Sequence, residues 1–260
     1  MCQSAALLLT PVLTVCAMYP ASAAPEEIQV YMDELNAPGE VGLDMHINDV
    51  LQGDAGTDYP GAETNLHRWR ATPEFSLGLS KEFELGLYLP LATLAPDGVV
   101  RAQGVKARIK WLAPHTEEGF YWGANLEVGR VSYRLDQNPW NGELKGIAGW
   151  RRGKWIVAAN ANVDFVIDGP VGGPTTFELD GKVGYKLTPG FTLGIESYNA
   201  MGPVRSIGQF STNDQATFLA ADTHIGKWDL NLGIGEGYGG NRDSLIVKAV
   251  VGVPLGLHLK

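Results

Sequence analysis

The sequence predicts an all-β protein: a closed, antiparallel, up-and-down transmembrane β-barrel of about twelve strands. Apolar and polar side chains alternate along one segment after another, as expected for strands with two unlike faces. The connections alternate between short turns and longer loops, which is typical of outer-membrane barrels with short periplasmic turns and longer extracellular loops. All seven tryptophans fall on the apolar faces, near the ends of segments.

The N-terminus predicts export. Residues 1–23 are expected to be a signal peptide, because Ala5 to Met18 is apolar and Ala21-Ser22-Ala23 is a small-x-small cleavage site. Both cysteines lie in this segment, so the mature chain must be held together without disulfides, and barrel closure is one way. Residues 24–39 are expected to be a periplasmic N-terminal segment with room for a short amphipathic helix; a small plug inside the lumen is the alternative. Residues 40–260 then form the barrel.

The clearest hairpin runs from Trp69 to Leu91. Its odd positions are apolar and most of its even positions are polar. A three-residue loop at 80–82 would keep the two apolar faces in phase. The predicted pairs are Leu79–Phe83, Leu77–Leu85, Phe75–Leu87 and Ala71–Leu91. Pro73 and Pro90 cannot donate to a ladder, so we expect local bulges there.

The other strands follow the same period. In chain order they are expected near 40–51, 101–113, 119–132, 140–150, 154–167, 176–187, 191–199, 215–225, 228–235 and 244–254. Keeping apolar faces together across the turns predicts the pairs Trp111–Trp122, Trp150–Trp155, Trp140–Phe165, Tyr185–Leu193, Val183–Ile195 and His224–Asp229. An even number of strands places both termini on the periplasmic side.

The tryptophans predict two aromatic girdles around a band of Leu, Val, Ile and Ala that faces outer-membrane lipids. The girdle residues are Trp69, Trp111, Trp122, Trp140, Trp150, Trp155 and Trp228. In a soluble β-sandwich the apolar face would be a core, and large aromatics would have no reason to gather at strand ends.

The polar faces point into the lumen. The lumen-lining candidates are Arg70, Glu74, Glu84, Tyr88, Lys106, Arg108, Lys110, Glu127, Lys182, Glu196, His224 and Asp229. Register places Lys106 opposite Glu127 and Lys182 opposite Glu196. Such pairs either stiffen the wall or line a pore for small polar or charged solutes, with Lys106, Arg108 and Lys110 as a basic ladder. The two signs nearly balance, which predicts weak ion selectivity.

Several function classes receive no support. A net charge of -9 argues against nucleic acid as a partner. No G-x-S-x-G, zinc-spaced histidines, P-loop or Rossmann glycine pattern is present, so no cofactor, metal or catalytic residue is predicted. Two alternatives to a channel stay open: a barrel enzyme that acts on lipids, and a surface-binding or structural barrel. His46 has no obvious serine partner for lipid hydrolysis.

One repeated unit carries a family resemblance. The stretch from Leu79 to Pro90 recurs from Leu187 to Ile195 as a turn, an aromatic residue and a Leu-Gly step. This pattern resembles the uncharacterised transporter-like outer-membrane barrels grouped with the phenol-degradation MetA-pathway family. The resemblance implies a transport barrel but no residue-level mechanism. Such barrels end in an aromatic residue that the barrel-assembly machinery reads, whereas this chain ends in Gly256–Lys260; the tail overhangs the last strand or the signal is atypical.

Overall fold

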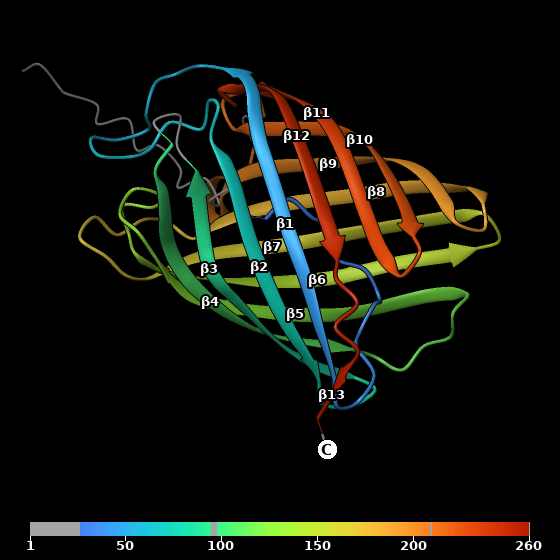
Figure 1. Cartoon of the computed structure of the whole chain (residues 1–260). Helices are drawn as coiled ribbons and strands as arrows, with labels where there is room; N and C mark the ends of the chain where they lie inside the picture. Colours follow the sequence, from blue (N-terminus) through green and yellow to red (C-terminus); the bar gives the residue numbers. More distant parts are fainter. Residues whose placement is uncertain (1–26, 95–97, 209, 260) are drawn as a thin grey trace, which may run out of the picture.

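The described residues form a closed barrel in which every long strand is antiparallel to its neighbours (Figure 1). The structure is a computed structural model that describes residues 27–94, 98–208 and 210–259. Twelve strands make the ring, and β1 pairs with β12 to close it. The predicted fold class is therefore confirmed. The expected signal peptide lies outside the described residues.

The strands match the predicted segments to within a few residues. They are β1 (Glu40–Gly53), β2 (Trp69–Gly78), β3 (Phe83–Leu94), β4 (Val100–Leu112), β5 (Gly119–Val131), β6 (Trp140–Arg152), β7 (Trp155–Asp168), β8 (Thr176–Thr188), β9 (Phe191–Pro203), β10 (Asp214–Ile225), β11 (Trp228–Gly239), β12 (Asp243–Gly252) and the short β13 (Leu257–His258). Within the described ranges, no helix has both the length and the apolar character to cross a membrane.

The barrel wall has the reverse of a soluble protein's polarity. On β7 the exposed side chains include Trp155 and Val157, whereas Asn160 and Asn162 are buried in the interior. The same alternation runs along β5. Because apolar groups gain by leaving water, an apolar exterior around a polar interior fits a barrel whose outer surface is covered by lipid.

The tryptophans lie on this exterior. Six of them are 38–51% exposed, and Trp111 is partly covered because it packs edge-on against Trp122, with ring centroids 5.0 Å apart. Trp69 begins β2 and Trp140 begins β6, both at the long-loop end, while Trp155 begins β7 at the short-turn end. This placement fits two interfacial girdles, whose contact with lipid remains a prediction.

The predicted register is correct at three hairpins. Leu77 pairs with Leu85 between β2 and β3, Val183 pairs with Ile195 between β8 and β9, and His224 pairs with Asp229 between β10 and β11. Register shifts lie beside both Pro73 and Pro90, where bulges were expected. The shift beside Pro73 makes the predicted pair Ala71–Leu91 wrong: Ala71 pairs with Ala92 instead.

Two other hairpins are displaced by two residues from the prediction. Between β6 and β7 the turn is tighter than expected, because Gly153 adopts a φ of +58° and Arg152 pairs with Trp155. Trp150 therefore pairs with Val157, and Trp140 with Asp168 rather than Phe165. Between β4 and β5, likewise, the partners are Trp111–Ala124, Arg108–Glu127 and Lys106–Gly129, not Trp111–Trp122 and Lys106–Glu127. A two-residue displacement leaves each side chain on its predicted face.

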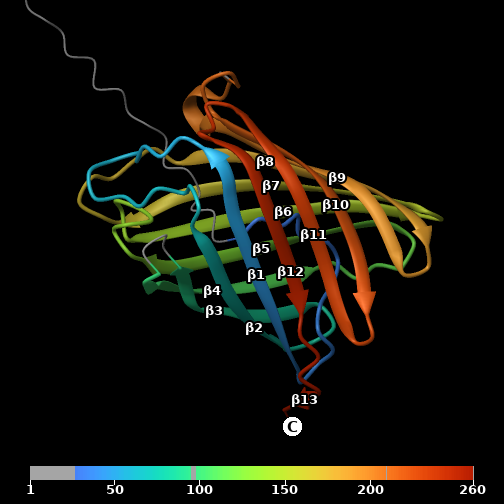
Figure 2. The ribbon, with the colours of Figure 1, turned by 45° about the horizontal axis from the view of Figure 1, so that its top comes forward.

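The ends of the barrel differ, as the loop lengths predict. Short turns lie at one end and longer loops at the other (Figures 1 and 2). The C-terminal tail does not hang free of the strands: Leu257 and His258 pair with Val41 and Glu40 at the start of β1. The tail thus extends the seam between β1 and β12 at the short-turn end.

Candidate functional site: the charged lumen

Residues 27–39, called the strap here, run through the interior of the barrel (blue in Figures 1 and 2). The short amphipathic helix that the sequence allows is not present in residues 27–39. The backbone of Tyr31 instead bonds to a wall side chain: its N–H donates to Asn160 Oδ1 at 2.6 Å, and Asn160 Nδ2 donates to its carbonyl at 2.9 Å. A wall amide thus replaces the partner that a helix would provide for the strap's backbone. The strap therefore lies inside the lumen, as in the alternative prediction of a plug.

Charged contacts hold the strap at the short-turn end. Arg151 on β6 makes a forked contact with Asp33 and reaches Glu34 at 2.7 Å. The backbone N–H of Asn36 donates to Glu84 on β3 at 2.8 Å. The strap passes so close to Gly78 that a Cβ there would lie 2.3 Å from the carbonyl oxygen of Ala37. The wall is thus shaped to admit the strap.

A first ion-pair network, the Arg108 network, lines the wall from β1 to β4. Arg108 contacts Glu74 and donates to Glu84 at 2.8 Å, and His46 Nε2 lies 3.1 Å from Glu74. Arg108 crosses over Gly86, where an added Cβ would come within 2.6 Å of its side chain. All four residues are at most 7% exposed, so they depend on one another for the interactions that water would otherwise provide.

The strap caps the Arg108 network. The hydroxyls of Tyr31 and Tyr88 lie 2.5 Å apart, and the Lys145 ammonium lies 4.4 Å from the centre of the Tyr31 ring. Lys110 donates to the carbonyl oxygen of Glu34 at 2.8 Å. The Tyr31 ring and the backbone of the strap thus cover Lys145 and Lys110 on this side of the lumen.

A second network, the Glu196 network, lies across β8, β9, β10 and β12. Lys182 is 3.0 Å from Glu196 and 2.8 Å from Asp222, and Lys248 also contacts Glu196. Lys248 donates in addition to the carbonyl of Ile28 at 2.9 Å, which ties the strap to a third part of the wall. The predicted pairing of Lys182 with Glu196 is therefore present and forms the centre of this network.

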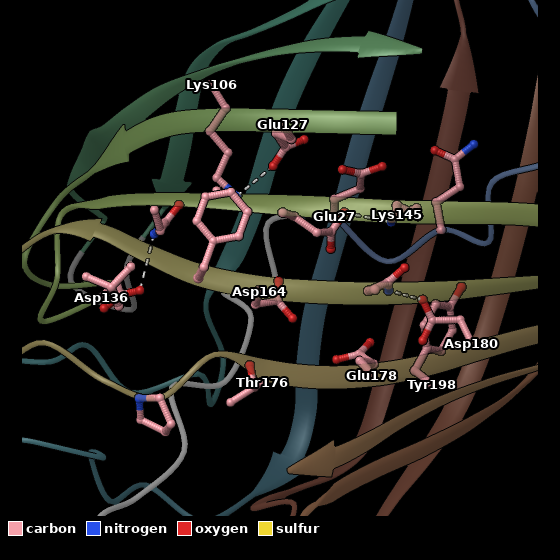
Figure 3. A pocket seen from close by; sticks show the side chains of 18 residues that line it. Glu27, Lys106, Glu127, Asp136, Lys145, Asp164, Thr176, Glu178, Asp180 and Tyr198 are labelled. Atoms are coloured by element: carbon pink, nitrogen blue, oxygen red, sulfur yellow. Dashed lines mark hydrogen bonds and ion pairs between the residues drawn. The ribbon is translucent and has the colours of Figure 1, made fainter. Parts of the chain in front are cut away.

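The acidic cavity occupies the long-loop half of the lumen (Figure 3). Its cavity volume is about 100 Å³. Two lysines line it among the described residues, and each faces a carboxylate: Lys106 is 3.1 Å from Glu127, and Lys145 is 3.2 Å from Glu143. Seven carboxylates line it in the same part of the chain: Glu27, Glu127, Asp136, Glu143, Asp164, Glu178 and Asp180.

An amide oxygen in the acidic cavity lacks a donor. Asn162 Nδ2 donates to Asp180 at 2.7 Å, whereas Asn162 Oδ1 is buried without a hydrogen-bond partner in the described part of the chain. Like an ionised carboxylate, an amide oxygen only accepts hydrogen bonds. The acidic cavity therefore offers an excess of acceptors to whatever enters it.

Ten of the twelve predicted lumen residues lie inside the barrel. Those that are buried are Arg70, Glu74, Glu84, Tyr88, Arg108, Lys110, Glu127, Lys182 and Glu196, and Lys106 is partly buried. The other two, His224 and Asp229, form a cross-strand pair at the short-turn end, where both are exposed. The basic ladder does not act as one row, because Lys106, Arg108 and Lys110 each bind a different partner.

Sequence reasoning missed the contribution of the strap. Tyr31 and Val30 are only 4% and 3% exposed, although they lie in a segment expected to be periplasmic. The available signal was the run Ile28 to Tyr31, which is too apolar for a solvated lead-in. The role of Asn160 could not be found, since an asparagine on a polar face is ordinary in a lumen wall.

With this geometry in view, comparison with known proteins identifies the architecture. No family model and no curated protein matches the chain. Three solved structures are similar: the KdgM porin (TM-score 0.54, 12% identity, covering 82% of this chain and 99% of that one), the NanC porin (0.53, 9%, 84% and 99%) and an outer membrane channel from Pseudomonas putida F1 (0.55, 12%, 87% and 100%). The chain has the fold of a porin-like outer-membrane barrel. At these identities the likeness establishes the fold alone.

Proposed function

We propose that this protein is an outer-membrane channel that passes small polar or charged solutes through a narrow lumen and favours cations. The observation that carries the proposal is the acidic cavity inside an apolar exterior. Carboxylates outnumber lysines in its lining among the described residues, and acidic linings tune pore selectivity. The printed names of the three similar structures, two porins and a channel, support the same function.

The number of strands makes the lumen narrow. Eight-stranded barrels are filled by side chains and those with 16–18 strands hold open channels, so twelve strands give an intermediate width. The strap fills part of that width at the level of Tyr31. We therefore expect low conductance from the full chain and higher conductance once the strap is removed.

A lipid hydrolase receives less support. His46 lies inside the lumen against Glu74 and is 1% exposed, which is far from lipid. We propose also that the chain belongs to the MetA-pathway grouping and that its exterior contacts outer-membrane lipids. We propose further that the barrel-assembly machinery recognises its tail. Each is suggested by the fold and by the sequence pattern.

Planar-bilayer recordings test the channel. Mature protein and a variant without residues 27–36 are compared in a KCl gradient, and the reversal potential gives the preference for K⁺ over Cl⁻. Glu178→Gln combined with Asp180→Asn should lower that preference, whereas Glu117→Gln, on an exposed turn, should leave it unchanged. If neither the full chain nor the strap-deleted variant conducts, the channel is refuted, and lipid hydrolysis and surface binding become the functions to assay.

A further inference from the structure

Three potential metal ligands meet where the strap crosses the wall. Glu27 lies on the strap, His46 on β1 and Glu74 on β2, and one ligand atom from each lies within 4.8 Å of the others. His46 Nε2 is 3.1 Å from Glu74 Oε2. The three residues are widely spaced in the sequence, so no spacing motif could reveal them. The cluster exists because the strap returns into the barrel beside the first two strands.

Two buried atoms on these three residues have no hydrogen-bond partner in the described part of the chain. His46 is 1% exposed, and within the ranges that the structure describes its Nδ1 has no hydrogen-bond partner. Among the same described residues, the buried Oε1 atom of Glu27 also has no hydrogen-bond partner. Buried polar atoms are normally satisfied, and such exceptions often mark a site for an ion or ligand. An imidazole nitrogen and a carboxylate oxygen are both metal donors.

The wall also orients the cluster. Arg108 contacts the Oε1 atom of Glu74 while the Oε2 atom faces His46, so one carboxylate is fixed by an outer residue. Hydrogen bonding of a ligating carboxylate from outside is the usual arrangement around protein metal ions. Glu27 supplies a second negative charge, which suits a doubly charged cation.

We propose that Glu27, His46 and Glu74 bind a divalent transition-metal ion of the Zn²⁺ class. One imidazole and two carboxylates suit such ions, and three protein ligands leave a coordination position for water. The bound ion would join the strap to the wall. Because it would bind only while the strap is in the lumen, occupancy would stabilise the strapped barrel.

Calorimetric titration of refolded mature protein with Zn²⁺ tests the site without recourse to conductance. We expect one saturable site per chain. Glu27→Gln and His46→Gln should each weaken binding by at least ~10-fold, the lower end of the loss seen even when an outer-shell partner is changed. His224→Gln is the matched control, because His224 is exposed at the turn end. Glu27 lies on the strap rather than the wall, so Glu27→Gln leaves the strand pairing intact.

A second readout separates the site from general metal binding. Zn²⁺ should raise the unfolding temperature of the wild type and not that of Glu27→Gln. The proposal is overturned if no saturable site appears, or if His224→Gln loses as much affinity as His46→Gln. Unchanged affinity in Glu27→Gln would also overturn it, because the ion would then sit on the wall without the strap. None of these results bears on whether the barrel conducts.

Discussion

Replacing Glu196 by glutamine should destabilise the barrel strongly. Glu196 is 1% exposed and accepts from Lys182 at 3.0 Å, Tyr198 at 2.9 Å and Asn231 at 3.1 Å, and it also contacts Lys248. The substitution removes the charge that both lysines share but preserves the shape. Hydrogen bonds to charged groups contribute about 1.5–3 kcal/mol each, and breaking a buried ion pair costs about 3–5 kcal/mol. We expect the free energy of unfolding to fall by about 3–5 kcal/mol.

Urea titration of protein refolded into lipid vesicles, followed by tryptophan fluorescence, measures this loss. Glu117→Gln, on an exposed turn, should change the unfolding free energy by no more than about 0.5 kcal/mol. Adding Lys248→Met to Glu196→Gln removes one of the stranded cations, so part of the lost stability should return. A loss below about 1 kcal/mol for Glu196→Gln would refute the reasoning, since it would mean that water reaches this part of the wall and screens the charges.

Two further predictions concern the lumen wall and the strap. Gly149→Ala should cost about 1–3 kcal/mol in the same urea titration, because its Cβ would lie 2.1 Å from the Tyr121 ring. Gly146→Ala, whose Cβ would be 3.8 Å from its nearest neighbour, should be tolerated, and equal losses would contradict this account. Arg151→Ala removes the forked contact with Asp33 and should raise single-channel conductance by loosening the strap. Unchanged conductance would show that Arg151 does not hold the strap.

The faces of the strands could be predicted because side-chain alternation is a local property of each strand. Leu219 is 55% exposed and Phe218 is 1% exposed, although the sequence of β10 is apolar on both sides. Pairing across a turn is less local. The displacement at β6 and β7 depends on Gly153 taking a positive φ, which composition alone does not reveal. Predicted faces survive such an error because the displacement is even.

The path of the strap could not be predicted, although a plug was left open as the alternative, because its position depends on contacts across the lumen. Tyr31 is held by Asn160 on β7, a residue 129 positions away. The sequence around either residue does not indicate this contact. The sequence predicts a periplasmic segment for residues 24–39, with a small plug as the alternative, and the strap carries the carboxylates of Asp33 and Glu34. Those carboxylates instead meet cations on the wall: Asp33 and Glu34 contact Arg151. An acidic lead-in beside a barrel with inward cations can therefore be drawn inside.

The location of charge, rather than its balance, sets the expected selectivity. The inward cations and anions are nearly equal in number, and on that basis the sequence predicts a weakly selective pore. These cations are already paired with carboxylates, however. Arg108 lies between Glu74 and Glu84, and Lys182 and Lys248 share Glu196. Among the described residues, the acidic cavity is lined by seven carboxylates and only two lysines. A permeating ion meets that local excess first, so we expect the reversal potential to report cations even though the wall as a whole is almost neutral.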